Sequence, residues 1–375
     1  MRTLLLFMAV GCGRFGFQES GVAGPDDVDG SVGDSAGSVA PNLIFISPKQ
    51  PDANFGGLAG ADAICTDAAA AAGLGGTYRA WLSTPTVNAA SRFSTARGWV
   101  RVDGAPVADS MDSLTMQHQL FHPVALDATG NRVDVFVATG TDQNGKWSQL
   151  NGDGSCSGWT TAAVSASFKQ LVGLARFGTV GWTNAAGGDC NMPTSLYCLG
   201  IDRVSTLTIT PASGRKAFVS KANFDAATGI AGADTLCRGE ATAAGLANAG
   251  TFKALLATTA ASAASRFNEG GPPWVRVDGV EVAPTATALF DQQITAPIDV
   301  RADGTYNDQQ FGVAYTGALR PRDVGTNGTT CNNWSRNDAT GNGNFTDIFE
   351  SNFFSGYSAA CDRWPGSSHI YCLEP

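Results

Sequence analysis

Two long stretches of this chain repeat one another motif by motif. Gly57–Cys65 reads Gly-Leu-Ala-Gly-Ala-Asp-Ala-Ile-Cys, and Gly229–Cys237 reads Gly-Ile-Ala-Gly-Ala-Asp-Thr-Leu-Cys. Both copies continue in the same order with Ala-Ser-Arg-Phe, Trp-Val-Arg-Val-Asp-Gly, Thr-Gly, Cys-x-x-Trp and a closing Tyr-Cys-Leu. Two copies are too few for a stacked repeat protein, and each copy holds its own set of cysteines. The sequence therefore predicts a tandem duplication of one domain.

The repeat also sets the expected domain boundaries. The expected segments are a signal at 1–12, an acidic Gly/Ser linker at 13–41, a first domain at 42–200, a second linker at 201–215 and a second domain at 216–375. The first linker is rich in Gly, Ser, Val and Asp and has no hydrophobic periodicity, so we expect it to stay solvated and extended. It would then hold the domains away from a membrane surface.

The first residues have the features of an export signal. Arg2 precedes a short apolar run, and the small-residue stretch Ala9-Val10-Gly11 leads directly to Cys12. This arrangement resembles a bacterial lipoprotein signal, in which the cysteine takes a diacylglyceryl thioether and becomes the mature N-terminus. Ala9 stands where Leu is more usual and the apolar run is short, which leaves open a start codon farther upstream. The alternative is a plain secretory signal that carries a cysteine.

The cysteine count agrees with export and lipidation. The chain has nine cysteines, and an odd number in an exported protein points to one thiol with a special role. Without Cys12, four remain in each copy: Cys65, Cys156, Cys190 and Cys198, then Cys237, Cys331, Cys361 and Cys372. Disulfides persist outside the cytoplasm, so we expect these eight to be bridged. Four cysteines permit three pairings, and the spacing alone does not choose among them.

Each copy has the pattern of a small α+β domain. Apolar residues at helical spacing predict an amphipathic helix over Gly57–Ala72 with Cys65 on its buried side, ended by Gly73. Short apolar runs predict strands, and Asp103-Gly104 predicts a two-residue hairpin turn after a strand that begins at Trp99. The first domain would thus hold one main helix, several short strands and long loops, and the second would repeat it.

These motifs resemble the C-type-lectin-like fold, and more closely the related endostatin-like domain of unknown function that recurs in bacterial surface lipoproteins. The Gly-Leu-Ala-Gly-Ala-Asp-x-x-Cys block, the Trp-x-Arg-x-Asp-Gly hairpin and the closing Tyr-Cys-Leu carry the resemblance over 43–199 and 216–375. It implies two tandem domains, each with one main helix, short antiparallel strands, long loops and two nested disulfides. The implied pairs are Cys65–Cys198, Cys156–Cys190, Cys237–Cys372 and Cys331–Cys361.

Charge and hydropathy argue against nucleic-acid binding and against a membrane-spanning helix. The net charge is −9, whereas nucleic-acid binding needs clustered Lys and Arg, so nucleic acid is not an expected partner. No stretch reaches the roughly 18 apolar residues of a spanning helix. We therefore expect contact with the membrane only through a lipid on Cys12.

The sequence offers no catalytic motif, and we predict that the chain is not an enzyme. It has no Gly-x-Ser-x-Gly elbow, phosphate loop or zinc signature. The repeated Asp62/Asp234, Arg92/Arg266 and Arg101/Arg276 belong to the motifs that both copies share, which is the pattern of a scaffold. His118 and His122 stand four residues apart, but Pro123 follows and the second copy has no equivalent. We interpret them as exposed loop histidines, not as metal ligands.

The loops near the second and third cysteines of each copy hold the candidate ligand-binding residues. These are Trp147, Trp182 and Trp364 as aromatic faces, with Asp142, Asn144, Asp153 and Asn333 as polar neighbours. An aromatic face flanked by Asn and Asp suits a sugar ring or a peptide side chain. The Cys-x-x-Trp tryptophans are instead expected in the core.

No cofactor is expected. Bound calcium is the alternative, because the oxygen atoms of Asp and Asn side chains suit this ion. The calcium motifs of sugar-binding lectins, however, are not carried over.

Two functions fit these features. The first is a lipid-anchored recognition protein on the outer membrane or cell surface that binds a polysaccharide or protein. The second is a structural envelope lipoprotein with no soluble ligand. Loop aromatics in the first copy favour the first function.

Overall fold

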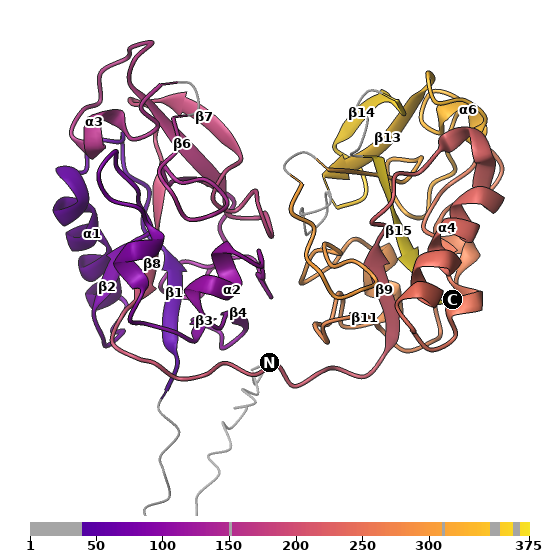
Figure 1. Cartoon of the computed structure of the whole chain (residues 1–375), viewed down its shortest axis with the longest axis horizontal. Helices are drawn as coiled ribbons and strands as arrows, with labels where there is room; N and C mark the ends of the chain where they lie inside the picture. Colours follow the sequence, from indigo (N-terminus) through magenta and orange to yellow (C-terminus); the bar gives the residue numbers. More distant parts are fainter. Residues whose placement is uncertain (1–39, 150–151, 310–311, 346–352, 363–367) are drawn as a thin grey trace, which may run out of the picture. The chain divides into compact units, whose positions relative to one another are not determined.

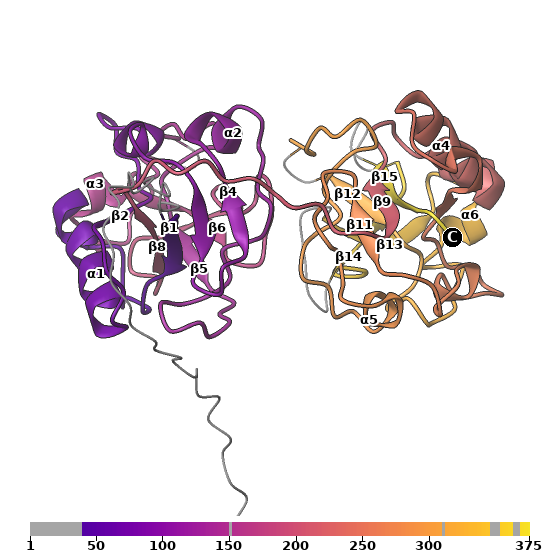
Figure 2. The same ribbon diagram turned by 90° about the horizontal axis from the view of Figure 1, so that it is seen from below.

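The computed structural model describes residues 40–149, 152–309, 312–345, 353–362 and 368–375. The protein is a mixed α+β structure in which each copy of the repeat forms its own sheet (Figures 1 and 2). The expected signal, with Cys12, and the expected first linker up to residue 39 lie outside the described residues, as does Trp364. The second linker, 201–215, has no helix, and β9 begins at its last residue.

The elements of the first copy follow the repeat motifs. They are β1 (Asn42–Ile46), α1 (Gly57–Ala71), β2 (Tyr78–Ala80), η1 (Ala90–Phe93), β3 (Trp99–Arg101), β4 (Pro106–Ala108), α2 (Met111–Thr115), β5 (Phe136–Ala138), α3 (Cys156–Trp159), β6 (Lys169–Leu174), β7 (Ala186–Asp189) and β8 (Ser195–Gly200). The long helix is α1, which packs beside the sheet near β2 and β8. It matches the helix that the sequence predicts to within one residue.

The second copy repeats this order. Its elements are β9 (Arg215–Val219), η2 (Ala226–Thr228), α4 (Gly229–Ala243), η3 (Ala249–Thr251), β10 (Lys253–Ala254), η4 (Ala264–Arg266), β11 (Trp274–Arg276), α5 (Ala286–Phe290), β12 (Val313–Tyr315), α6 (Cys331–Trp334), β13 (Thr340–Phe345), β14 (Tyr357–Ala360) and β15 (Ser368–Leu373). The described residues contain no counterpart of β4 as a named strand, although Val275 and Glu281 form an isolated bridge there.

The main helix of each copy ends at a glycine, as the sequence predicts. Gly73 has a φ of +70°, which lets the N–H of Leu74 donate to the carbonyl of Ala69 at 2.9 Å. Gly245 has a φ of +69°, and Leu246 donates to Ala241 at 2.9 Å. Glycine adopts this left-handed conformation without the steric penalty of a β-carbon, so it terminates the helix at a fixed residue.

The sheets are mixed, which corrects the expectation of antiparallel strands. The first has the order β4-β3-β1-β8-β5-β6-β7, with β2 also on β8; the second has β11-β9-β15-β12-β13-β14, with β10 also on β15. In the first copy β1 is parallel to β3 and β5 is parallel to β8, and the second copy has the same two parallel pairs. Long connections separate these partners along the chain, and such connections permit parallel pairing where a hairpin does not.

The central strands are buried on both faces. In β1, Phe45 joins the helix-side core, whereas Ile44 and Ile46 join the core on the opposite face. In β8, Cys198 likewise lies in the helix-side core and Tyr197 in the core on the opposite face. Alternation of side chains along a strand therefore supplies two cores from one sheet.

Two disulfides close each copy in the nested pattern that the resemblance implies. Cys65–Cys198 and Cys237–Cys372 each join the main helix to the closing strand, with Cα atoms 5.3 Å apart. Cys156–Cys190 and Cys331–Cys361 join the loop region, with Cα separations of 5.7 and 6.3 Å. On the chain-entropy model the long loops stabilise by about 5 kcal/mol each and the short ones by about 4 kcal/mol. No bridge joins the two copies among the described residues.

Candidate functional site

The Cys-x-x-Trp motif forms one turn of left-handed helix in both copies. Cys156 and Trp159 have φ values of 46° and 68°, and Cys331 and Trp334 have φ values of 47° and 58°, with left-handed residues between them. Such a conformation costs roughly 1–2 kcal/mol per non-glycine residue, so other contacts must hold it. The cysteine is held by its disulfide, and the tryptophan is buried in the core. The prediction that these two tryptophans are core residues is confirmed.

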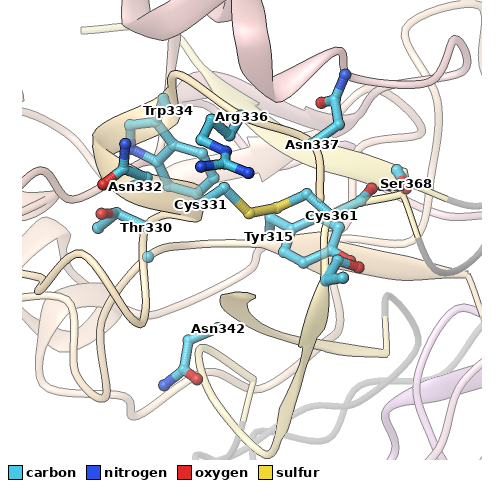
Figure 3. Close-up of a disulfide and its surroundings, with 12 residues drawn as sticks. Tyr315, Thr330, Cys331, Asn332, Trp334, Arg336, Asn337, Asn342, Cys361 and Ser368 are labelled. Carbon is cyan, nitrogen blue, oxygen red and sulfur yellow. Dashed lines mark hydrogen bonds between the residues drawn. A yellow bond between two sulfur atoms is a disulfide. The ribbon is translucent and has the colours of Figure 1, made fainter. Parts of the chain in front are cut away.

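Figure 3 shows this turn in the second copy, with the sulfur atoms of Cys331 and Cys361 beside Tyr315. The indole N–H of Trp334 donates to the carbonyl of Ala257 at 2.7 Å. A β-carbon on Gly317 would stand 2.6 Å from the Trp334 ring, which explains the Thr-Gly motif that both copies share. The turn is therefore a packed structural element and exposes no reactive group of the disulfide.

The repeated acidic and basic residues bind one another. Arg92 donates to both carboxylate oxygens of Asp62, at 2.7 and 2.6 Å, and also to the carbonyl of Ala80. Arg266 and Asp234 make the same bidentate pair at 2.8 and 2.7 Å. These pairs tie the main helix to the next strand and the short helix after it, which is the scaffold role that the sequence predicts.

The Trp-x-Arg-x-Asp-Gly hairpin is a second repeated pair. Arg101 lies 2.7 Å from the carboxylate of Asp103, and Arg276 lies 2.6 Å from Asp278. In the second copy Arg276 is fully buried and also pairs with the fully buried Asp299 at 2.7 Å. The second copy therefore contains a buried charge network that the first copy lacks.

The polar candidates of the first-copy loop stabilise the loop itself. One carboxylate oxygen of Asp142 accepts the backbone N–H groups of Asn144 and Lys146, each at 2.9 Å. Asp153 accepts the N–H of Ser155, and its own carbonyl accepts the indole N–H of Trp147 at 2.7 Å. Trp147 is half-buried. The structure thus brings Trp147 and Asp153 together; whether they bind a ligand stays a prediction.

Of the other candidates, Trp182 is placed differently from the expectation. Trp182 is 1% exposed and packs between Trp81 and Tyr197, with ring centroids 5.1 and 5.3 Å away. It offers no face to a ligand, because the loop that carries it folds into the core instead of over the surface. Asn333 is exposed, and its side-chain oxygen accepts the N–H of Thr259 at 3.1 Å. Trp364 lies outside the described residues.

The two histidines of the first copy are partly buried, not exposed as the sequence suggests. A ring nitrogen of His122 lies 2.8 Å from the carbonyl oxygen of Pro106. Burial lowers the pKa of His122 to about 4 and also lowers the pKa of His118. Within the described ranges, no group of three or more His, Cys, Asp and Glu side chains is arranged to hold a metal ion.

A cavity occurs at the same place in both copies, between the end of the first strand, the last turns of the main helix and a hairpin turn. The turn is 127–131 in the first copy and 301–305 in the second. The two turns are at equivalent positions, because the residue before each turn accepts a hydrogen bond from the end of the first strand. The N–H of Ile46 donates to the carbonyl of Leu126 in the first copy, and the N–H of Val219 donates to the carbonyl of Val300 in the second. The sequence contains no motif for this cavity, since its lining comes from segments far apart in the chain.

The first-copy cavity has a volume of about 300 Å³ and is mostly apolar. Its lining consists of Ile46, Ser47, Pro48, Lys49, Ala68, Ala71, Ala72, Asp127, Ala128, Thr129, Val133, Val135 and Ser195. The Asp127 carboxylate is occupied by its own turn, because it accepts hydrogen bonds from Thr129 and Asn131. No hydrogen bond or ion pair within the described part of the chain involves the ammonium group of Lys49.

A second cavity of the first copy adjoins this one. It has a volume of about 340 Å³ and shares Lys49 and Val135 with the apolar cavity. Its other lining residues include Phe136, which is 41% exposed, and the pair of Arg176 with Asp134, whose atoms lie 2.6 and 2.8 Å apart. We call the two cavities together the first-copy groove.

The equivalent cavity of the second copy has a volume of about 390 Å³ and also has a mostly apolar surface, but four of its eight lining residues are charged. Lys221 pairs with Asp303 at 2.7 Å, and Arg301 pairs with Asp308 at 2.8 Å. Burial raises the pKa of Glu240, whose carboxylate accepts the backbone N–H of Lys221. Burial alone would raise the pKa of Asp303, but hydrogen bonds from Lys221 and Thr305 outweigh it and lower that pKa to about 2.

At two equivalent places the second copy has larger polar side chains than the first. His369 takes the place of Ser195, and Arg301 takes the place of Asp127 in the aligned turn. His369 is fully buried, and its ring lies 3.1 Å from the side-chain oxygen of Gln309. Burial, and then the charge of Arg301, lower the pKa of His369 to about 4. The charged groups around the second-copy cavity are therefore occupied by ion pairs and hydrogen bonds, whereas most of its lining surface is apolar.

Comparison with known proteins assigns no family to the chain. None of the protein-family models matches it, and no curated protein is similar to it. The resemblance to C-type-lectin-like domains therefore stays a prediction from the motifs.

Proposed function

We propose that this protein is an exported, lipid-anchored recognition protein that binds a polysaccharide or protein outside the inner membrane and catalyses no reaction. The observation that carries the proposal is the cavity that recurs at one place in both copies. Clefts lined by apolar side chains with a few polar groups at the rim are the usual form of a binding site. Two such sites on one chain would add avidity if a polymeric ligand engages both.

The state of the repeated polar residues supports binding over catalysis. Asp62, Arg92, Asp234 and Arg266 are consumed by bidentate pairs that hold the scaffold. The eight cysteines of the two copies are bridged, so none of them offers a thiol nucleophile. A recognition role needs only a shaped surface, which the cavities provide.

Export and anchoring rest on the cysteines and on the sequence before Cys12. Four disulfides in one chain are typical of proteins outside the cytoplasm. None of the described helices has the length and apolar character needed to cross a bilayer. We propose that a diacylglyceryl group on Cys12 attaches the protein to the cell envelope, in the outer membrane or at the cell surface.

For the fold, we propose two tandem C-type-lectin-like domains. The support is the nested disulfide pattern, together with a closing strand that returns beside the main helix in each copy. The mixed sheet and the left-handed Cys-x-x-Trp turn are further features by which a solved structure of a lectin-like domain can be compared with this one.

The recognition function is tested by binding of the full chain to glycan and extracellular-protein arrays. We expect binding that falls when Ala71→Leu and Ala243→Leu are combined, because these equivalent alanines line the two cavities. A chain that binds nothing on either array would favour a structural envelope protein. Binding that survives the double substitution would place the site elsewhere, with Trp147 as the next candidate.

The anchor is tested separately by Cys12→Ser. We expect this variant to lose the lipid label that the unaltered chain acquires from radioactive palmitate in living cells. Equal labelling of the variant would contradict lipidation at Cys12.

A further inference from the structure

We infer that the first-copy groove binds a peptide segment in which an apolar side chain is followed by an acidic one. This inference rests on the proposed recognition function and selects the ligand class for the first copy. It depends on the lining of the apolar cavity, on Lys49 at the junction of the two cavities, and on the exposed ring of Phe136.

The apolar cavity matches a hydrocarbon side chain better than a sugar. Its walls are mainly the side chains of alanine, valine and isoleucine. The hydroxyl of Ser47 is already used, since it donates to the carbonyl of Pro48 and accepts the N–H of Leu196. A sugar hydroxyl placed against the alanine, valine and isoleucine side chains would lose its hydrogen bonds to water without replacement, which is costly, whereas a leucine or phenylalanine side chain would lose none.

Lys49 supplies the charge that an acidic residue would meet. It lines both cavities and is exposed, and no ion pair within the described ranges engages it. The other charges of the groove are occupied: Arg176 and Asp134 bind each other, and Asp127 is bonded within its turn. An acidic side chain next to the apolar one would therefore reach the one cation of the groove that has no partner in the described structure.

The second copy shows that the fold also accepts charged residues around this cavity. Glu240 stands at the position of Ala68, and the ion pairs of Lys221 and Arg301 occupy the surrounding space. Because the same backbone frame accepts these charged residues, the fold does not require Ala68 at this place in the first copy. We expect the second copy to bind apolar peptides much more weakly.

The test measures binding of the full chain to an array of tetrapeptides whose two central residues run through all amino acids. We expect the strongest signals for leucine, isoleucine or phenylalanine followed by glutamate or aspartate. The serine-leucine-glutamate-serine peptide is then titrated in solution, with a serine-alanine-glutamate-serine peptide, hexanoate and a neutral hexose oligomer as the comparison probes. The leucine peptide should bind at least about tenfold more tightly than the alanine peptide.

Matched variants identify the groove as the site. Ala71→Leu should weaken binding of the leucine peptide at least about tenfold, because Ala71 lines the cavity. Ala70→Leu, on the next exposed residue of the same helix but outside the lining, and Ala243→Leu, in the second copy, should leave binding unchanged. Lys49→Met should weaken binding of the glutamate-containing leucine peptide severalfold and remove the salt dependence of that binding.

The outcomes separate this inference from the proposed function. Preferential binding of the hexose oligomer or of hexanoate, or peptide binding unaffected by Ala71→Leu, overturns the inference but leaves a recognition protein. Failure of the full chain to bind any array or probe overturns both. Circular dichroism and thermal unfolding of each variant ensure that a loss of binding reflects the groove, since Ala71 is exposed and outside the core.

Discussion

The equivalent cavities of the two copies have the same backbone frame and a mostly apolar lining, but different charged residues around them. In the first copy the small residues Ala68 and Ser195 line the cavity, whereas Glu240 and His369 stand at those places in the second copy. The frame is kept because both disulfides, the bidentate Asp–Arg pair and the left-handed turn recur. Several side chains that line the cavity differ between the copies although these contacts of the frame are kept. The duplication thus retained a scaffold and diversified its surface.

The largest difference in stability should come from the buried charges of the second copy. Arg276→Met leaves Asp278 and the fully buried Asp299 without their cation, so we expect a loss of about 3–5 kcal/mol in the unfolding free energy of this copy. Arg101→Met in the first copy leaves only the partly exposed Asp103, and we expect about 1–2 kcal/mol. Hydrogen–deuterium exchange of peptides from each copy gives both values. Equal losses would show that the two networks are energetically alike.

Acid should destabilise the second copy through His369. Its pKa is about 4 in the folded protein, below the usual value of about 6.5 in an unfolded chain, so the unfolded state takes up the proton first. The stabilisation is therefore complete above about pH 6.5 and declines as the pH falls toward 4, by about 3 kcal/mol at most. His369→Gln should flatten this decline in exchange measurements of the second copy.

The first copy provides the control for this pH dependence. His122 has a pKa of about 4 as well, so the first copy should also lose stability in acid. That loss should persist in the His369→Gln variant. If the variant altered the acid response of both copies equally, the assignment of the effect to His369 would be wrong.

The left-handed turn allows residues to be exchanged between copies. Gly158 has a φ of +68° with open space around the position of a β-carbon, and Asn333 occupies the same place in the second copy. Gly158→Asn should change the unfolding free energy by less than about 0.5 kcal/mol, whereas Gly158→Val should cost about 1–2 kcal/mol, because a β-branched residue resists this conformation. Urea unfolding distinguishes them, and equal effects of Asn and Val would show that the turn is not held in this conformation.

The smallest effects on stability should come from Lys49 in the first-copy cavity and Lys221 in the equivalent cavity of the second copy. Lys221→Ala breaks an ion pair whose side chains are 60% and 38% exposed, so we expect a loss below about 1 kcal/mol. Lys49→Ala removes no ion pair of the described structure and should leave stability unchanged. A larger loss for Lys49 would reveal a structural role and weaken its assignment to ligand binding. Urea unfolding of both variants makes this comparison.

Much of the scaffold could be predicted from the sequence, because its signals are local. The helix over Gly57–Ala72 follows from periodicity and a terminal glycine, and the hairpin after Trp99 follows from Asp103-Gly104. The left-handed turn had a weaker signal in Ser157-Gly158 and Asn332-Asn333, since glycine and asparagine tolerate positive φ. The burial of Trp182 had no signal in the sequence, because a loop-rich segment with a tryptophan has the same sequence pattern whether the loop covers the core or enters it.

The sequence by itself determined the duplication, the allocation of four cysteines to each copy, and the helix and hairpin that recur, since order and spacing along the chain carry this information. Only the tertiary structure decided the parallel strand pairs, the paired state of the repeated Asp and Arg residues, and the two cavities. Each of these joins segments that are far apart in the chain, such as the end of β1, the last turns of α1 and the turn at 127–131. Whether such segments meet depends on packing and strand register, which no single segment specifies.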